Sequence, residues 1–466
     1  MNPNILNFLN LAYLASSILF ILCLRGLSSP ESARRGILLG EIGMFIAVVA
    51  TLLHWEIVSY TWIIVGLIVG SGIGTAISLR IPMTKMPERI ALSHSFGGLA
   101  TALVGVSEYY RHGGHVSRLS MGALGFEVFL GFLTFTGSIM AFGKLQGLIT
   151  GAPITYKGQN VTNVGLFFGA LAMLVYQVVF GANDMLFIAM GAIGLALGVL
   201  AVMPIGGADM PVVISLLNSY AGLAASATGF AIGSNILIIS GALDGSSGLL
   251  LSLLMSKAMN RSFSNVVFGA FGTAIEPGQQ SPTGTAASFN EATVEDAADV
   301  LRAAQNVIVV PGYGMAVSQA QHAVRDLAAA LQKRGVEVKY AIHPVAGRMP
   351  GHMNVLLAEA NVPYDELFDL DDINDDFVRT DAVLVVGAND VVNPAAKKDK
   401  ASPIYGMPVF NVELSRSIIV LKRSMNPGFS GVENELFFLS NTMMVLGDAK
   451  KTLLALGGAL KGEGGH

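Results

Sequence analysis

The chain has 466 residues, of which 52% are hydrophobic and only 13% are charged, whereas an ordinary soluble chain carries about a quarter charged residues. Its net charge is −4, and the part after Arg261 holds 16 basic against 23 acidic residues, so it lacks the basic surface that nucleic-acid binding requires. The single cysteine, Cys23, excludes an internal disulfide and a cysteine-rich metal site, and we expect no metal site in this chain.

Nine windows before residue 260 are long and apolar enough to cross a bilayer, which takes roughly 20 mainly apolar residues. They lie near residues 5–24, 36–55, 60–79, 90–108, 123–143, 162–181, 184–203, 210–230 and 235–256. No basic residue precedes the first window and Arg25 follows it directly, which favours an uncleaved helix over a signal peptide. Residues 1–261 are therefore predicted to form a polytopic α-helical membrane domain. Glycine-rich stretches at 66–74 and 241–248 indicate close helix packing through small residues.

The basic residues between these windows predict the orientation of the membrane domain, because cytoplasmic connections are enriched in Lys and Arg. If the N-terminus is outside, the outer connections hold Arg111 and Arg118, and the inner connections hold ten cations. The ten are Arg25, Arg34, Arg35, Arg80, Lys85, Arg89, Lys144, Lys157, Lys257 and Arg261. Nine spans then place the C-terminal domain in the cytoplasm.

Polar side chains inside the windows form the candidate site of the membrane domain, because each is costly in hydrocarbon and tends to face a cavity or a partner. His94, Asn218 and Ser247 come from three windows and are predicted to lie roughly 7 to 13 Å from the inner edge of the bilayer. Asp244, near the midplane, and Glu127, near the outer end of its window, lie toward the outside, and Asp244 shares a helix face with Ser247. Histidine exchanges a proton near neutral pH while Asn and Ser relay or orient water, so the set predicts a proton route. The alternative at each position is an ordinary interhelical hydrogen bond.

Residues 262–292 gather Gly, Pro, Ser, Thr and Gln and are predicted to be a flexible linker. Residues 293–466 are predicted to form an α/β Rossmann-like domain with a mainly parallel sheet. The domain opens with a short helix that Thr293 caps, with Asp296 three residues on. Strands are predicted at 306–311, 336–343, 381–387, 407–412 and 417–421.

The first predicted strand meets a glycine turn that opens a helix over residues 318–334. Gly312, Tyr313, Gly314, Ala316 and Val317 fit the spacing of the dinucleotide fingerprint Gly-x-Gly-x-x-Ala/Gly, with Val317 at the third place. Gly312 permits a tight turn, and Gly314 lets a pyrophosphate approach the backbone amides at the start of the helix. The alternative is a plain β-to-α turn.

The ends of two other predicted strands indicate which dinucleotide is bound. The second strand ends in His343, where an NAD site normally carries Asp or Glu. The last strand ends in Lys422, Arg423 and Ser424, which are donors suited to a phosphomonoester. The absent acid and the basic trio together favour NADP(H) over NAD(H), although a solvated basic pair is the alternative for Lys422 and Arg423.

Two further loops follow strand ends, where open α/β sheets bind their ligands. One contains Arg348, a candidate for pyrophosphate binding. The other begins at Gly387 and contains Asn389 and Asp390, which are suited to an amide or a ribose.

Five longer strings are highly specific. They are Gly206-Gly-Ala-Asp-Met-Pro-Val-Val, Pro311-Gly-Tyr-Gly-Met-Ala-Val, His343-Pro-Val-Ala-Gly-Arg-Met-Pro-Gly-His, Gly387-Ala-Asn-Asp-Val-Val-Asn-Pro and Lys422-Arg-Ser-Met-Asn. Over nearly the whole chain the sequence resembles the β subunit of proton-translocating NAD(P) transhydrogenase. The resemblance implies reversible hydride transfer between NADH on a partner subunit and NADP⁺ on this chain, coupled to proton translocation.

The same resemblance implies an α subunit that carries the NAD(H) domain and further helices, a dimer of αβ units, and a place in the bacterial inner membrane. It implies proton transfer for His94 and coupling roles for Asn218, Asp209, Ser246 and Ser247. For the cofactor it implies contacts with the Gly312 loop, Arg348, Asp390 and the trio at 422–424, and a nucleotide that lies inverted relative to a usual Rossmann site.

Two positions depart from the resemblance: Phe429 stands where a tyrosine is more usual, and Asp244 stands where we expect an apolar residue.

A function of a different class shares this layout, namely an ion channel or transporter gated by a cytosolic nucleotide-sensing Rossmann domain. The sequence shows no filter-like motif and no inverted repeat of the kinds that such proteins use.

Overall fold

The computed structural model describes residues 3–53, 59–81, 85–111, 117–150, 153–206, 209–258, 263, 289–348, 351–400, 402, 404–428 and 430–461. The chain divides into two compact units, a helical unit in the N-terminal part and an α/β unit in the C-terminal part. The predicted linker up to residue 288 and Phe429 lie outside the described residues, apart from position 263.

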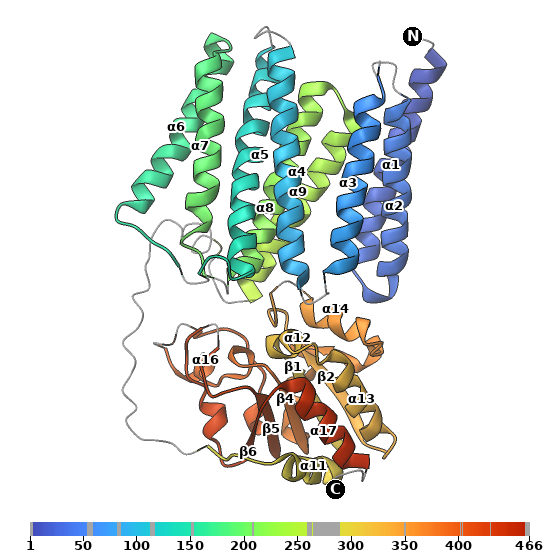
Figure 1. The fold of residues 1–466 in the computed structure, drawn as a ribbon, viewed down its shortest axis with the longest axis vertical. Coiled ribbons are helices and arrows are strands. Elements are labelled where there is room, and N and C mark those ends of the chain that lie inside the picture. The colour runs from blue at the N-terminus through green and yellow to red at the C-terminus, as the bar shows by residue number, and fades with distance from the viewer. Residues whose placement is uncertain are drawn as a thin grey trace. The chain divides into compact units, whose positions relative to one another are not determined.

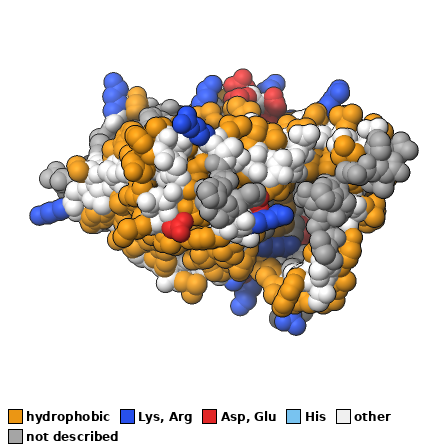
Figure 2. Space-filling view, turned by 90° about the horizontal axis from the view of Figure 1, so that it is seen from above, with side chains coloured by type: hydrophobic (Ala, Val, Ile, Leu, Met, Phe, Trp, Pro, Cys, Tyr) orange, Lys and Arg blue, Asp and Glu red, His pale blue; other side chains and the backbone are white. Residues whose placement is uncertain are grey.

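Long apolar helices build the first unit, and they run side by side in Figure 1. They are α1 (Pro3–Leu27), α2 (Pro30–Leu52), α3 (Thr61–Arg80), α4 (Met86–Arg111), α5 (Arg118–Leu145), α6 (Gln159–Phe180), α7 (Asp184–Val202), α8 (Met210–Ile232) and α9 (Asn235–Ala258). Within the described residues these nine are long and apolar enough to span a membrane, and each coincides with a predicted window. Figure 2 views the molecule from above, and hydrophobic side chains cover much of that face, with Lys and Arg side chains around its edge. The predicted membrane domain is confirmed.

Glycine allows α8 and α9 to pack backbone against backbone. A Cβ atom added to Gly222 would lie 2.3 Å from the amide nitrogen of Gly245, and one added to Gly241 would lie 2.4 Å from that of Ser226. The prediction of close packing at 241–248 is therefore confirmed. For the glycines at 66–74 in α3, the described residues place nothing within 4 Å of the added Cβ.

Serine hydroxyls join the same two helices. Four of them donate to carbonyl oxygens across the α8–α9 contact, over 2.6 to 3.2 Å. The pairs are Ser215 with Gly248, Ser219 with Gly245, Ser226 with Ile238, and Ser252 with Val212. Because each hydroxyl is satisfied at depth in the helical unit, the pair holds a fixed register.

A six-stranded sheet forms the centre of the second unit. Its strands are β1 (Asn306–Pro311), β2 (Glu337–Ile342), β3 (Leu367–Asp369), β4 (Ala382–Val386), β5 (Ser417–Lys422) and β6 (Thr442–Leu446). They lie in the order β3-β2-β1-β4-β5-β6 and every pair is parallel. All five residues of the central strand β4 are fully buried, as expected for a parallel strand covered on both faces. The predicted Rossmann-like fold is confirmed.

Helices connect and cover the strands (Figure 1). They are α11 (Val294–Ala303), α12 (Tyr313–Val317), α13 (Gln321–Gln332), α14 (His352–Glu359), α15 (Leu370–Ile373), α16 (Ala395–Lys398) and α17 (Ala449–Lys461). Short 3-10 turns add η3 (Tyr364–Glu366), η4 (Asp376–Arg379), η5 (Asp390–Val392), η6 (Val412–Leu414) and η7 (Glu435–Phe438). The predicted helix over 318–334 begins only at Gln321, because Gln319 has a left-handed backbone with φ 51° that ends α12 and separates it from α13.

The predicted strand at 407–412 is wrong. Its backbone bonds to loops instead: the Phe410 amide donates to the Val391 carbonyl over 3.0 Å, and the Asn411 amide donates to the Asn374 side chain over 2.7 Å. Pro408 has no amide hydrogen to offer to a sheet. The missed strands, β3 and β6, lie at the two edges of the sheet.

The α/β unit begins with a segment that pairs with the last strand. The Met444 amide donates to the Asn290 carbonyl over 2.8 Å, and the Ala292 amide donates to the Met444 carbonyl over 3.0 Å. Thr293 then caps α11, and the predicted reciprocal bonds with Asp296 are both present. The contacts of this unit thus start ahead of residue 293.

Candidate functional site

The order of the strands brings most of the predicted cofactor residues to one edge of the sheet. The order reverses between β1 and β4, and open α/β sheets bind ligands beyond the carboxyl ends of the strands at that point. Gly312 follows β1 and Gly387 follows β4. The loops after β2 and β5, which carry Arg348 and Arg423, leave the same edge because all the strands are parallel.

The two glycine loops at this edge pack against each other. The Gly312 amide donates to the Val386 carbonyl over 2.9 Å, and the Gly314 amide donates to the Gly387 carbonyl over 2.9 Å. A Cβ atom added to Gly387, where φ is +64°, would lie 2.4 Å from the Cα atom of Gly314. The glycines therefore serve this loop-to-loop contact, and the Gly314 amide is engaged within the chain.

The remaining positions of the glycine fingerprint differ in burial. Ala316 is fully buried, Val317 is 46% exposed, and Tyr313 is half-buried. Helix α12 ends after five residues. The side chains of the fingerprint thus range from buried at Ala316 to exposed at Val317, with Tyr313 between them.

Tyr313 meets the loop after β2 through Arg348 and His352. The Arg348 guanidinium lies 4.5 Å from the centre of the Tyr313 ring, and the Arg348 amide donates to His352 Nδ1 over 3.1 Å. Burial, reinforced by the positive charge of Arg348, lowers the pKa of His352 to about 4, so its ring is neutral at pH 7. Because Nδ1 accepts, the proton lies on Nε2. Among the described residues no partner meets this buried Nε2 donor.

The loop after β4 is held by the segment that follows β5. The Asp390 carboxylate accepts from the Ser430 hydroxyl over 2.6 Å and from the Ser430 amide over 3.1 Å. The Asn434 side chain donates to the Asn389 side-chain oxygen over 3.0 Å. Burial raises the pKa of Asp390, while its bonds to Ser430 and the charge of Lys422 oppose the rise. Within the described part of the chain, the buried Asn389 Nδ2 has no partner.

In the basic trio at the end of β5, Lys422 packs against neighbouring residues, whereas Arg423 is exposed to solvent. The Lys422 ammonium donates to the Asn426 carbonyl and lies 4.7 Å from the centre of the Phe437 ring. Burial lowers the pKa of Lys422, and the charge of Asp390 opposes the fall. The Arg423 side chain is 61% exposed and lies 4.0 Å from the Asp448 carboxylate.

Ser424 is also exposed. Arg423 and Ser424 are therefore open to an incoming anion, whereas Lys422 is anchored beside them.

The end of β2 supplies no carboxylate. His343 stands there, only 2% exposed, with its ring 5.4 Å from that of Phe410. Burial lowers the pKa of His343 to about 4, and the neutral ring bonds through Nε2 to the Pro408 carbonyl over 2.8 Å. His343 thereby holds the segment at 407–412, which was predicted to be a strand.

His352, Ser430 and Asn434 were not among the predicted site residues. His352 lies in a predicted ligand loop, but no local signal distinguishes it from its neighbours. Ser430 is 40 residues from its partner Asp390, and Asn434 is 45 residues from its partner Asn389. Only the tertiary fold brings these pairs together.

In the helical unit, three predicted polar residues come together from α4, α8 and α9. The Asn218 side-chain amide donates to Asp244 Oδ1 over 3.0 Å. His94 and Asp244 interact electrostatically. His94 Nδ1 is buried and has no hydrogen-bond partner among the described residues. The sequence predicts similar depths for His94, Asn218 and Ser247, whereas the structure pairs Asn218 with Asp244, which was predicted to lie nearer the midplane.

The other predicted members have different surroundings. The Ser247 hydroxyl bonds within α9 to the carbonyl of Asp244, and Ser246 is exposed. Asp209 precedes α8 by one residue and lies nine residues from Asn218, roughly 13 Å along the axis. Glu127 is fully buried on α5, where a Cβ atom added to Gly105 would lie 2.9 Å from its carboxyl carbon.

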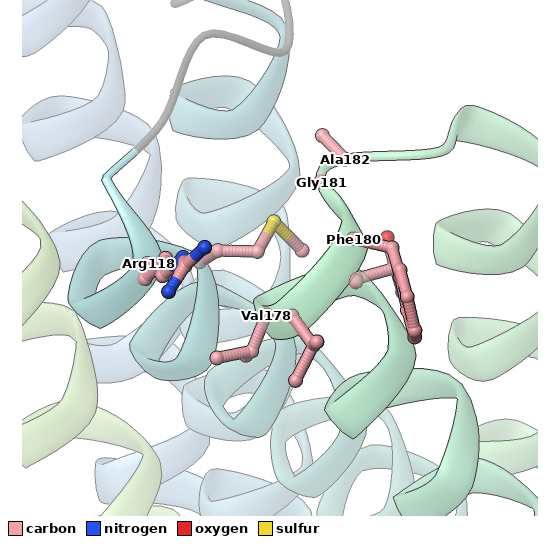
Figure 3. A pocket seen from close by; sticks show the side chains of 8 residues that line it. Arg118, Val178, Phe180, Gly181 and Ala182 are labelled. Atoms are coloured by element: carbon pink, nitrogen blue, oxygen red, sulfur yellow. The ribbon is translucent and has the colours of Figure 1, made fainter.

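A pocket in the helical unit lies away from these residues. Arg118 at the start of α5 and the stretch from Gln177 to Ala182 line it (Figure 3). No predicted site residue lines this pocket. The described residues also contain no group of three or more His, Cys, Asp or Glu side chains that could hold a metal ion.

Comparison with known proteins covers both units. The family model described as "NAD(P) transhydrogenase beta subunit" matches residues 9–458. The chain is 52% identical over 451 residues to "NAD(P) transhydrogenase subunit beta" of Rhodospirillum rubrum, a match that covers 94% of this chain and 96% of the relative. A protein of the same name from a designated strain of that species shows the same identity and coverage. The chain belongs to the NAD(P) transhydrogenase beta subunit family.

Proposed function

We propose that this chain is the NADP(H)-binding subunit of a proton-translocating transhydrogenase. It transfers hydride reversibly between NADH on an α subunit and NADP⁺ at the carboxyl edge of its own sheet, and it couples this transfer to proton movement across the membrane. The observation that carries the proposal is the carboxyl edge itself, where Arg423 and Ser424 are exposed and no acid stands at the end of β2.

The residues at this edge fit a dinucleotide with a 2′-phosphate. Arg423 and Ser424 offer charged and neutral donors to a phosphomonoester, with Lys422 anchored beside them. Asn389 Nδ2 and His352 Nε2 are buried donors without partners among the described residues, and such donors call for a polar ligand. In our proposal the nucleotide also contacts Gly312, Gly387, Arg348 and the other predicted cofactor residues.

When bound, the nicotinamide supplies the hydride chemistry. The residues of this chain bind and orient the nucleotide and exclude water from the site. They contribute to the rate by aligning the reacting carbon atoms. Tyr313, Arg348 and His352 fix the loop after β2, while Ser430 and Asn434 fix the loop after β4. Both loops are thereby ordered before the ligand arrives.

For the membrane side, we assign proton transfer to His94 and coupling to Asn218, Asp209, Ser246 and Ser247. The hydrogen bond of Asn218 within the cluster supports a polar path at that depth. Coupling requires that the protonation of this path changes the relative affinity of the domain for NADP⁺ and NADPH, a reciprocal free energy between two sites.

The proposed assembly is a dimer of αβ units in a bacterial inner membrane. The bias of basic residues supports an N-terminus outside and a C-terminal domain in the cytoplasm. The α subunit contributes the NAD(H) domain and further helices.

Reconstitution tests this function. The chain is co-expressed with an NAD(H)-binding α subunit and placed in liposomes, and both hydride exchange between the two nucleotides and acidification of the lumen are measured. We expect the two to occur together, and His94→Ala to abolish acidification while NADP(H) still binds. Nucleotide-gated ion flux without hydride exchange would show that the chain is a transporter instead.

A further inference from the structure

We propose that Asp244 is a second proton carrier, which exchanges a proton with His94 beside Asn218. The inference rests on the proposed function, because it adds a residue to the proton route. It concerns a carboxyl group that lies within a membrane-spanning helix, accepts a hydrogen bond from Asn218 of α8 and interacts electrostatically with His94 of α4.

The position of Asp244 is fixed by the packing of α8 against α9. The Ser219 hydroxyl donates to the carbonyl of Gly245, the next residue in α9, over 2.6 Å. A Cβ atom added to Gly248 would lie 3.1 Å from Asn218 Nδ2, so the Asn218 amide is confined against α9. Its hydrogen bond to Asp244 Oδ1 therefore has a defined geometry.

An amide cannot neutralise a carboxylate, and an isolated carboxylate in a bilayer is costly. Asp244 needs either a proton or a nearby cation. Among the described residues, the charge that acts on Asp244 is that of His94, and the charge that acts on His94 is that of Asp244. The other ionisable side chains of α4, α5, α8 and α9 are Glu88, Arg89, Glu108, Tyr109, Tyr110, Arg111, Arg118, Glu127, Lys144, Tyr220 and Lys257.

The two groups together favour one shared proton. With one proton the pair is neutral overall, either as imidazolium with carboxylate or as imidazole with carboxylic acid. A second proton would give the pair a net positive charge, and loss of the shared proton would give it a net negative charge. A low-dielectric setting disfavours both of these charged states. The pair thus passes one proton at a time.

The transfer balances without any further reactant. An N–H bond of the His94 imidazolium breaks, an O–H bond forms on the Asp244 carboxylate, and the reverse step restores the pair. Asp244 stands at an exposed position of α9, so the helices of this chain leave it open to exchange its proton with water or with a group of the α subunit.

Substitutions in the assembled αβ complex separate this role from a structural one. Asp244→Asn keeps the size and a hydrogen-bonding side chain but cannot carry a proton, whereas Asp244→Glu keeps the acid. We expect Asp244→Asn to lower proton pumping in liposomes at least on the order of tenfold, and Asp244→Glu to restore most of it. Asp184→Asn is the matched control, because Asp184 is a carboxylate at the start of α7 that bonds to Tyr109 over 2.9 Å. It should pump like the parent.

Infrared difference spectra of the complex loaded with NADP⁺ and with NADPH report the protonation directly. We expect a carboxylic-acid band that disappears in Asp244→Asn and remains in Asp184→Asn. Co-purification with the α subunit and NADP(H) binding show that each variant is assembled.

Full pumping by Asp244→Asn would overturn the inference and leave the proposed function intact. Loss of pumping in both the Asn and the Glu variant, with the infrared band unchanged, would also overturn it, since the side chain would then only hold the helices together. Normal pumping by His94→Ala would instead overturn the proposed function.

Discussion

The hydroxyl of Ser430 donates to the carboxylate of Asp390 over 2.6 Å and joins the segment after β5 to the loop after β4. A hydrogen bond to a charged group contributes roughly 1.5–3 kcal/mol. Ser430→Ala should therefore loosen the loop that carries Asn389 and Asp390, and lower both the stability of the α/β domain and its affinity for NADP(H). Urea denaturation and nucleotide titration measure the two effects. Ser440→Ala, at an exposed position after η7, is the control and should change neither.

The exposure of Arg423 predicts unequal effects within the basic trio. Arg423→Ala should cost roughly 1.5–3 kcal/mol of NADP(H) binding, which is at least tenfold in affinity, because the 2′-phosphate carries close to two charges. Removing Lys422 as well should bring the loss to at least about a hundredfold. Titration should show little change in the weak binding of NAD(H).

Arg416→Ala is the matched control for Arg423, because Arg416 is 81% exposed and lies just ahead of β5 at the opposite end of the strand. It should leave both affinities unchanged. An equal loss for NADP(H) and NAD(H) in the Arg423 variant would show that this arginine does not read the 2′-phosphate.

The start of the α/β domain can be tested with two fragments. A fragment from residue 289 keeps the bonds of Asn290 and Ala292 to Met444, and a fragment from residue 293 loses them. Each bond contributes roughly 0.5–1.5 kcal/mol, so the shorter fragment should be about 1–3 kcal/mol less stable to urea. Both fragments should be soluble and bind NADP(H), and equal stability would place the domain boundary at Thr293.

Two buried histidines predict how the stability of this domain depends on pH. Burial lowers the pKa of His343 and of His352 to about 4 in the folded state, against about 6.5 in the unfolded chain. The unfolded chain therefore binds protons first as the pH falls. The stabilisation is fully present above pH 6.5 and is lost progressively down to pH 4, by up to about 3 kcal/mol for each histidine.

Urea denaturation of the 289–466 fragment at a series of pH values measures this loss. His352→Gln should flatten the curve by about half, because Gln does not titrate in this range. A curve unchanged by that substitution would show that His352 is not protonated on unfolding.

The sequence predicted the membrane helices and the central strands well, for reasons visible in particular residues. Runs such as 184–203 are too long and too apolar to be anything but spans, and β4 is an uninterrupted buried run. The segment at 407–412 has the same apolar character, but Pro408 and the bond from His343 place it in a loop. Short apolar runs do not reveal whether they pair with a strand or lie beneath a loop.

The site was predictable where residues adjoin a strand end and not where partners come from far along the chain. Gly312, Gly387 and Arg423 follow strands, so their shared edge follows from the parallel order. The bonds of Ser430 and Asn434 to the β4 loop span 40 and 45 residues, and no spacing rule reaches that far. The predicted depths grouped Asn218 with His94 and Ser247 and placed Asp244 nearer the midplane. The hydrogen bond between Asn218 and Asp244 was therefore not predicted, because it depends on which helix faces meet each other.

The glycines of the β1 and β4 loops join these two loops through their backbones. Gly314 and Gly387 touch backbone to backbone and share a hydrogen bond, so neither loop can shift without displacing the other. Asn389 of the β4 loop is thus linked through these glycines to Tyr313, and Tyr313 contacts the guanidinium of Arg348. If NADP(H) binds at this edge as we propose, we expect both loops to respond together to the oxidation state of the nucleotide.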